Sequence, residues 1–340
     1  MLAYLKLKTN NEELYETNYL EELSKKQTRI SKLQYHVCKY YYELVTKIKY
    51  IMNIITIKQV YDAYLFILPF SNCNENKKME KCMKKVKKIM QLYNIESLVV
   101  EEKLKQNEKF KQIIKAETKR VHILDGRGIM PYLIRETLEY ILTKQGTQTE
   151  LEDLYICIKE NKILHVENIM YLIKYFKTVN IVTPNIREFQ KLANKIEEKE
   201  NIIVTVTNNK KKSLKKAKII VNFDFLENEI NKYVIYREAI LLTIDEKGFY
   251  ESNTFNGIQI RRIGIDTSSK IKEDFNQYNL LKDNQLTTLY ESIINQKQGL
   301  LQVKQKMKED KVKVIKLYGK NGSLWKIYEF SWQMAKNLVY

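Results

Sequence analysis

Glycine and proline are scarce: the 340 residues include 9 glycines and 3 prolines. This scarcity excludes collagen-like chains and Pro/Gly-rich low-complexity chains. No glycine precedes Gly126 and none occurs from Thr147 through Lys247, so the turns in both regions must use Asn, Asp, Lys and Ser. The chain is 44% hydrophobic and 29% charged, which is the composition of a folded protein and excludes a wholly disordered one.

Long apolar runs are also missing. The best candidate, residues 51–70, is interrupted by Lys58 and Asp62, so we expect no membrane span. The first residues lack a signal-peptide pattern. The 4 cysteines form no CxxC pair and no disulfide framework, which is typical of a reducing compartment and predicts a cytoplasmic protein. No metal site is expected, because the three histidines (His36, His122 and His165) show no zinc-binding spacing.

Arginine is rare although the chain is basic. There are 59 basic and 41 acidic residues, a net charge of +18, and 8 of the 59 basic residues are arginines. The charge attracts polyanions, but base-edge and bidentate phosphate recognition favours arginine. The lysines concentrate in residues 77–88, 210–218 and 304–320, and the apolar spacing within the first run is that of an amphipathic helix with a solvated lysine face. Polyanion binding is therefore an alternative that the sequence does not favour.

The first half of the chain mixes helices and strands. Residues 1–50 are interpreted as a helical N-terminal segment, and residues 51–146 as an N-terminal α/β domain that ends at Gly146. The expected helices cover residues 12–49, 76–93, 107–116 and 128–144, and the expected strands cover 50–57, 60–69, 97–100 and 120–124. The apolar run 60–69 also fits a helix.

In the second half, apolar β-branched runs alternate with helices. The expected strands are 154–158, 179–182, 202–206, 218–221 and 239–244, separated by helices at 163–176, 187–198, 213–217 and 226–231. This alternation predicts right-handed βαβ units and a parallel sheet covered on both faces. We therefore expect a two-domain α/β fold: the N-terminal α/β domain, then a Rossmann-like parallel sheet with flanking helices over 151–270. A helix over 273–301 and a tail follow within 271–340.

Three segments carry a family resemblance. Asp125-Gly-Arg-Gly128 opens a long helix, residues 179–193 form a strand and a helix, and residues 215–222 lead into another strand. Together they resemble the shikimate dehydrogenase family over about residues 95–300. The resemblance implies NADP or NAD as cofactor and Asp125 as a catalytic residue that pairs with a lysine at the reacting hydroxyl. The family's V-T-x-P motif, which carries that lysine, is absent from residues 1–124. Alternatively, Asp125 is a helix N-cap.

The cofactor site departs from the dinucleotide-binding pattern. The first βα turn, Ile158-Lys-Glu-Asn-Lys-Ile163, contains no glycine, although glycines let backbone N–H groups approach a pyrophosphate. Glu160 would also place a carboxylate where anions should sit. The remaining binding candidates follow the strands of the predicted sheet: Lys159, Asn161, Thr183, Asn185, Thr207 and Asn222, with Asn208 and Asp224 beside them. These side chains equally suit turns, which is the favoured interpretation.

A second resemblance is shorter. Ser71-Asn-Cys-Asn-Glu75 resembles the nucleophile motif of glutamyl-tRNA reductases, which implies a reactive Cys73. The arginine of that motif is missing, so an ordinary loop cysteine is the favoured interpretation. Cys82 and Cys157 lie on apolar faces and are expected in the core.

These observations predict a divergent Rossmann-like protein that has lost ordinary dinucleotide binding and has a regulatory or assembly role. No cofactor is expected, and a homodimer is one candidate assembly. One alternative is an NAD(P)-dependent oxidoreductase with an unusual phosphate loop over residues 159–163. The other is a basic nucleic-acid-binding protein. The sequence does not decide whether the protein is an enzyme.

Overall fold

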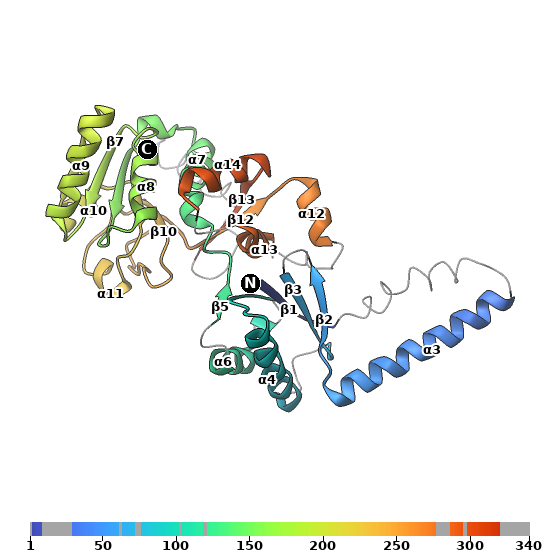
Figure 1. The fold of residues 1–340 in the computed structure, drawn as a ribbon. Coiled ribbons are helices and arrows are strands. Elements are labelled where there is room, and N and C mark those ends of the chain that lie inside the picture. Colours follow the sequence, from blue (N-terminus) through green and yellow to red (C-terminus); the bar gives the residue numbers. More distant parts are fainter. Residues whose placement is uncertain are drawn as a thin grey trace. The chain divides into compact units, whose positions relative to one another are not determined.

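The structure, a computed structural model, describes residues 2–8, 29–60, 63–71, 76–101, 104–105, 107–117, 121–276, 286–294 and 298–319. The chain divides into two compact units, residues 1–125 and 126–340 (Figure 1). The sequence places the division later, after Gly146. The division differs because apolar side chains between Ile129 and Leu142 pack into the core of the second unit.

The first unit contains a sheet with the strand order β2-β3-β1-β4-β5. Its strands are β1 (Leu2–Leu7), β2 (Thr56–Val60), β3 (Ala63–Leu68), β4 (Ser97–Val100) and β5 (His122–Leu124). β1 is central and parallel to both β3 and β4. The helices described are α3 (Arg29–Met52), α4 (Asn76–Leu92) and α6 (Glu108–Glu117), of which α4 and α6 contribute to a core with one face of the sheet.

Two sequence expectations for the first unit are wrong. The segment 1–50 is not helical throughout, because its first residues form the central strand β1. A strand over 50–57 is also wrong: α3 continues through Met52, and β2 begins only at Thr56. Residues 12–28 of the expected helix 12–49 lie outside the described residues, as does Cys73.

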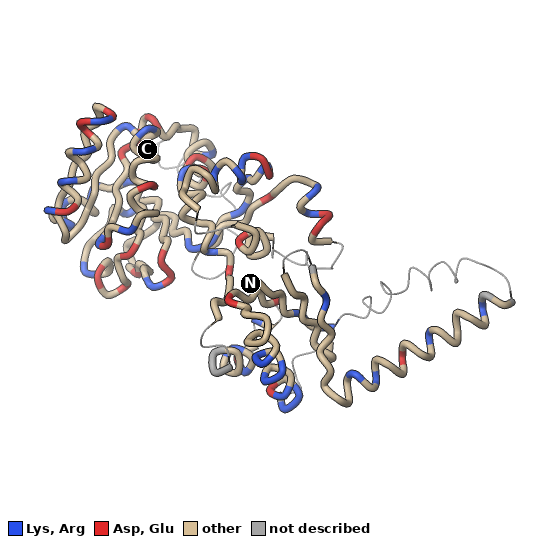
Figure 2. Tube along the Cα trace, in the orientation of Figure 1, with Lys and Arg blue, Asp and Glu red and all other residues tan. Residues whose placement is uncertain are grey.

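The amphipathic interpretation of the first lysine run is confirmed. In α4 the apolar residues Met79, Met83 and Val86 are fully buried, and most lysines of the helix are exposed (Figure 2). Burial raises the pKa of Cys82, on the same apolar face, to about 11.

The second unit contains the predicted parallel sheet. Its strands are β6 (Asp153–Cys157), β7 (Thr178–Val182), β8 (Val204–Thr207), β9 (Ile219–Asn222), β10 (Ile240–Thr243) and β11 (Ile258–Ile260). They lie in the order β11-β10-β9-β6-β7-β8, and every neighbouring pair is parallel. Counted from β6, this is the 3-2-1-4-5-6 order of the doubly wound Rossmann fold. The predicted fold class is confirmed.

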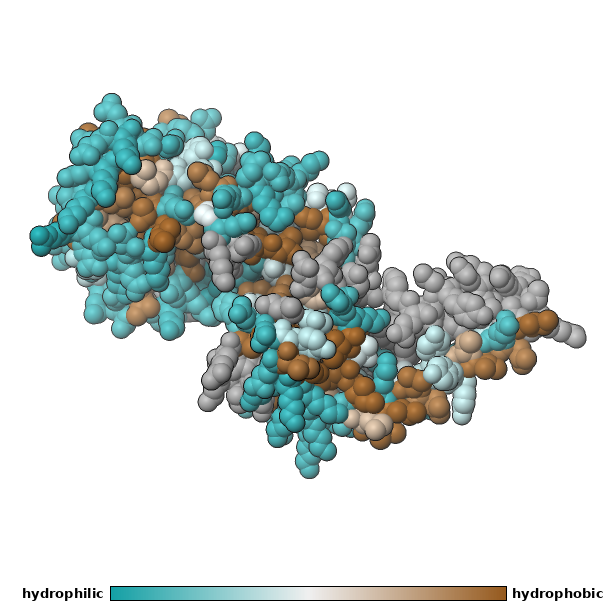
Figure 3. All heavy atoms as spheres, in the orientation of Figure 1, coloured by the Kyte–Doolittle hydropathy of each residue, from teal (hydrophilic) through white to brown (hydrophobic). Residues whose placement is uncertain are grey.

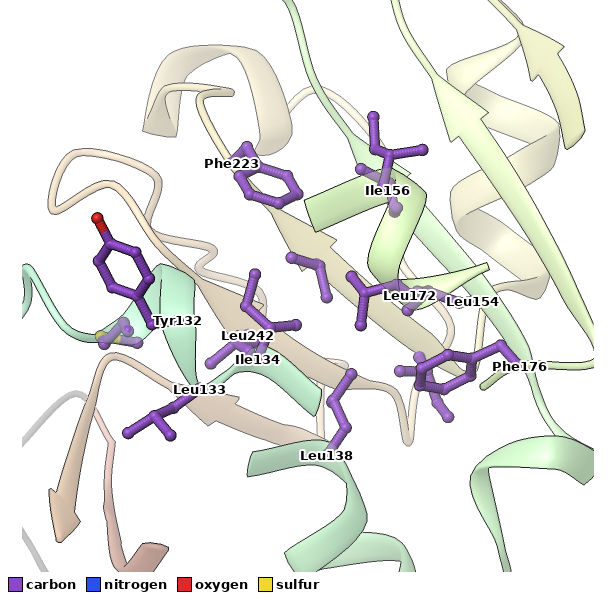
Figure 4. Close-up of a cluster of buried hydrophobic side chains, with 14 of the residues drawn as sticks. Tyr132, Leu133, Ile134, Leu138, Leu154, Ile156, Leu172, Phe176, Phe223 and Leu242 are labelled. Atoms are coloured by element: carbon purple, nitrogen blue, oxygen red, sulfur yellow. The ribbon is translucent and has the colours of Figure 1, made fainter. Parts of the chain in front are cut away.

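Alternate residues of these strands enter two different cores, as expected for a sheet covered on both faces. Leu154 and Ile156 of β6 pack with η1 (Met130–Tyr132), α7 (Ile134–Lys144), α8 (Ile163–Leu172) and α9 (Ile186–Glu200) in the larger core (Figure 4). Tyr155 and Cys157 face the other core, to which α10 (Lys210–Lys216) and α11 (Glu227–Ile230) contribute.

The C-terminal part differs from the single helix expected over 273–301. The described residues of this part form the helical segments α12 (Ser269–Asn276), α13 (Leu286–Ile293) and α14 (Leu300–Glu309), and an antiparallel pair, β12 (Arg262–Asp266) and β13 (Lys313–Tyr318). Gly299 occupies the N-cap position of α14 in an extended conformation, which separates α14 from the preceding residues. None of the helices that the structure describes combines the length and the apolar character needed to cross a membrane.

Candidate functional site

The candidate site lies where β6 and β9 are neighbours in the second unit. At this point the strand order reverses, because the chain runs outward through β7 and β8 on one side and through β10 and β11 on the other. In open parallel sheets, such a switch point forms a crevice at the carboxyl ends of the strands, where ligands bind. The loops after β6 and β9 therefore determine what the site can hold.

The loop after β6 directs two backbone N–H groups at one carboxylate. The N–H of Lys159 donates to Asp224 Oδ1 at 2.7 Å, and the N–H of Glu160 donates to Asp224 Oδ2 at 2.8 Å. Asp224 comes from the loop after β9, and only 7% of it is exposed. In a dinucleotide-binding Rossmann protein, N–H groups of this first βα turn receive the pyrophosphate. Here an internal carboxylate takes those hydrogen bonds.

A salt bridge joins the same turn to α11. Lys159 Nζ lies 2.7 Å from Glu229 Oε2, and the two side chains are 25% and 32% exposed, respectively. Glu229 also accepts a hydrogen bond from the N–H of Leu226 at 2.8 Å. Burial acts to raise the pKa of Glu229, but the hydrogen bonds from Lys159 and Leu226 prevail and lower it. The Lys159 side chain is thus paired with the protein's own acid at the crevice.

Glu160 does not occupy the anion position that the sequence predicted for it. Its side chain is exposed and forms a 2.7 Å salt bridge with Lys162, which lowers the pKa of the Glu160 carboxyl. The carboxylate that accepts hydrogen bonds from the turn is Asp224, which the sequence grouped with the turn residues. The placement of the Glu160 carboxylate at the anion position is therefore wrong.

Most of the other predicted binding residues lie at this edge and form hydrogen bonds within their own loop or to the neighbouring one. Asn185 Nδ2 donates to the Lys159 carbonyl at 2.7 Å, while the Asn185 N–H donates to Thr183 Oγ1 at 3.0 Å. Thr183 is fully buried, and Asn161 is exposed and donates to Glu188 Oε1 at 3.0 Å. Thr207 Oγ1 accepts a hydrogen bond from the N–H of Asn209 at 3.1 Å. The bonds to Thr183 and Thr207 are local turn bonds, whereas those of Asn185 and Asn161 join the segments that follow β6 and β7.

Asn222 connects the loops after β9 and β10. It is fully buried, donates to the carbonyls of Phe225 (2.9 Å) and Gly248 (3.3 Å), and accepts from the N–H of Phe225 (2.9 Å). A Cβ added at Gly248 would lie 2.5 Å from Asn222 Nδ2. Asn222 and Gly248 thus hold the two loops together, and the amide of Asn222 is used internally.

The Asp125-Gly-Arg-Gly128 turn is held by a second internal carboxylate. The N–H groups of Gly126 (2.6 Å) and Gly128 (2.9 Å) donate to Glu291 of α13, which is 3% exposed. The N-cap interpretation of Asp125 is wrong, because η1 begins only at Met130 and neither η1 nor α7 has a side-chain cap. No local pattern pointed to Glu291, which lies 163 residues away from Gly128.

The other cysteine and histidine candidates that the structure describes are engaged in packing or backbone contacts or lie at the surface. Burial raises the pKa of Cys157 to about 12, so its thiol stays protonated at neutral pH. His165 Nδ1 lies 3.0 Å from the Glu160 carbonyl, and its ring is 4.7 Å from that of Phe223. His122 is exposed on β5, an edge strand of its sheet. Within the described residues there is no cluster of His, Cys, Asp and Glu that could hold a metal ion.

No protein-family model and no curated protein sequence matches this chain. Its fold is similar to those of several solved enzymes. A Δ1-pyrroline-2-carboxylate reductase from Thermococcus litoralis, in complex with NADH and L-proline, has 10% identity and a TM-score of 0.28, and the match covers 37% of this chain and 41% of the reductase. An L-tryptophan dehydrogenase from Nostoc punctiforme has 9% identity and a TM-score of 0.30, with coverage of 91% and 87%.

A shikimate dehydrogenase in complex with NADP+ is also similar in fold. It has 10% identity and a TM-score of 0.29, and the match covers 76% of this chain and 83% of that enzyme. The assignment of a Rossmann-like fold rests on the strand order described above. What the site can bind must be judged from its own residues, because one fold serves many functions.

Proposed function

We propose that this chain is a divergent Rossmann-like protein that does not hold a dinucleotide in the ordinary way and acts by binding a partner, in regulation or assembly. The pair of hydrogen bonds from the N–H groups of Lys159 and Glu160 to Asp224 carries this proposal. It supports the view that the phosphate position of the fold is taken by the protein itself.

Both charge and space oppose a pyrophosphate at this turn. The pyrophosphate is an anion and would compete with the Asp224 carboxylate for the same two donors, and like charges at such short range repel strongly. No residue from 158 to 163 is a glycine, so each carries a Cβ where the backbone would have to approach the phosphates. Lys159, which could attract an anion, is engaged by Glu229. The residues present do not fit a dinucleotide in the conformation described.

Calorimetric titration with NADH and NADPH tests the proposal. We expect no binding by the wild-type protein at millimolar ligand. Asp224→Ala frees the two N–H groups and should bind inorganic pyrophosphate measurably. Asp224→Asn, which keeps the shape of the side chain, should bind it more weakly than Asp224→Ala. Glu160→Gln is the matched control, because it removes a neighbouring exposed carboxylate and should behave as the wild type. Micromolar binding of either dinucleotide by the wild type would overturn the proposal.

An NAD(P)-dependent oxidoreductase is the second candidate. The 3-2-1-4-5-6 strand order favours it, because that order places a ligand crevice between β6 and β9. This function requires Asp224 to leave the N–H groups of the turn before the dinucleotide can enter. It therefore predicts wild-type NADPH binding that is strengthened in Asp224→Ala, whereas the first proposal predicts no wild-type binding.

A further inference from the structure

The helix α3 carries a long apolar stripe that faces solvent. α3 has 24 residues and is therefore about 36 Å long. Nine of its large hydrophobic residues are between 43% and 71% exposed: Ile30, Leu33, Val37, Tyr40, Tyr41, Leu44, Ile48, Ile51 and Met52. Figure 3 shows apolar residues along this helix. Soluble monomers rarely leave so large a continuous apolar surface uncovered.

The stripe has the spacing of a coiled-coil seam. Ile30, Val37, Leu44 and Ile51 recur every seven residues, and Leu33 and Tyr40 lie three residues after the first two of them. These are the a and d positions of a heptad repeat. Tyr41 and Ile48 lie at e positions and Met52 at a b position, so the stripe is an a/d seam that is widened along one side. The pattern therefore favours another helix as the occupant.

The other side of α3 is already directed at its own unit. Tyr42, Val45 and Lys49 are partly buried and line a pocket with Thr56 of β2 and Ile67 of β3. At about 100° per residue, the centre of these positions lies roughly 115° around the helix from the centre of the stripe, with Val45 next to the edge of the stripe. The stripe is thus not the surface by which α3 contacts its own sheet.

We propose that the stripe of α3 pairs with the same stripe of a second copy of this chain. Two identical seams are self-complementary, since each supplies knobs and holes to the other in a two-fold arrangement. With exposed fractions of 43% to 71%, the seven apolar side chains of the stripe from Ile30 to Ile48 offer on the order of 900 Å² per copy. A standard interface buries about 800 Å² per partner. The inference rests on α3 alone and does not depend on the closed phosphate position.

The two helices pair antiparallel, because Lys47 occupies the third d position of the repeat. A parallel pair would place the two Lys47 ammonium groups against each other at the seam, where like charges repel. Antiparallel pairing centred between Tyr40 and Val37 separates the two lysines by roughly 25 Å along the axis. It stacks Leu33 on Leu44 and Val37 on Tyr40 between copies, and leaves each Lys47 near the end of the overlap, where its ammonium group can reach water.

Sedimentation equilibrium of the full-length protein tests the pairing. We expect twice the 40.7 kDa mass of one copy for the wild type. Leu33→Glu with Leu44→Glu should give the mass of one copy, while Lys32→Glu with Lys39→Glu, which places two glutamates outside the stripe on the same helix, should keep the doubled mass. Circular dichroism checks that each variant is folded. A wild-type mass of one copy overturns the proposal, whether or not the protein then sediments with anionic phosphatidylserine vesicles.

Disulfide crosslinking tests the orientation, in a background of Cys38→Ser and Cys73→Ser. In the antiparallel pair, Leu44→Cys alone places its two thiols roughly 16 Å apart along the axis, too far for a disulfide. Leu33→Cys combined with Leu44→Cys brings residue 33 of one copy to residue 44 of the other. We expect oxidation to crosslink the double variant and neither single variant. Crosslinking of a single variant would overturn the antiparallel pairing.

Discussion

The replacement Asp224→Ala removes a side chain that joins the turn after β6 to the loop after β9. Two backbone hydrogen bonds to a charged acceptor are lost, at Lys159 and Glu160. Hydrogen bonds to charged groups contribute about 1.5–3 kcal/mol each, and we take the low end because the turn lies at the surface and its N–H groups can rehydrate. The expected loss in the free energy of unfolding is therefore about 3 kcal/mol.

Thermal unfolding followed by circular dichroism measures this loss. For a unit of this size, about 3 kcal/mol corresponds to a decrease in Tm of about 6–12 °C. Glu160→Gln removes a neighbouring carboxylate that is exposed and should leave the Tm unchanged. Inorganic phosphate should raise the Tm of the Asp224→Ala variant more than that of the wild type. An anion at a concentration of 100 times its Kd stabilises the folded state by about 2.7 kcal/mol. If the Asp224→Ala variant has the same Tm as the wild type, and phosphate does not raise that Tm, this role of Asp224 is refuted.

Three further outcomes are expected. Gly126→Ala should lower the unfolding free energy by about 1–3 kcal/mol in urea titration, because φ at Gly126 is +89° and the new Cβ would lie 3.2 Å from Thr287 Cγ2. The pKa of Cys157 is raised from 9.0 to about 12 by burial, so stability is fully present below pH 9 and falls as the pH rises above it, by up to about 1.4 kcal/mol per pH unit; Cys157→Ala should flatten this alkaline loss in denaturation curves at pH 8 and 10. In fluorescence anisotropy, duplex DNA should bind negligibly at physiological salt, because the lysines of α4 and α10 belong to different units and arginine is scarce; tight binding that weakens steeply with salt and is abolished by charge reversal of Lys210, Lys211 and Lys212 would contradict this.

The strands of the second unit could be predicted because each is a short apolar run rich in β-branched residues. Such runs bury both faces in a parallel sheet, and the signal is local to each run. β6, β7 and β9 accordingly agree with the sequence to within about a residue. The absence of glycine after β6 is also a local signal. It indicates an altered phosphate position, because the backbone of that turn is constrained by its own residues.

The elements that the sequence missed depend on distant neighbours. β1 has only six residues and includes Lys6, and it becomes a central strand because β3 and β4 supply hydrogen bonds on both sides. Residues 273–301 have a helical apolar pattern, but periodicity alone does not indicate where a helix breaks. The pattern therefore predicts one helix, whereas the described residues form the three helical segments α12, α13 and α14.

The sequence by itself determined that the second half is a parallel α/β sheet and that its first turn lacks the glycines of a dinucleotide site. Only the tertiary structure decided which carboxylate meets that turn. Asp224 reaches the N–H groups of Lys159 and Glu160 across 64 or 65 positions in the chain because β9 lies beside β6, and Glu291 reaches Gly126 across 165 positions. Strand order sets these distances, and no local pattern encodes the partner of a backbone donor so far away.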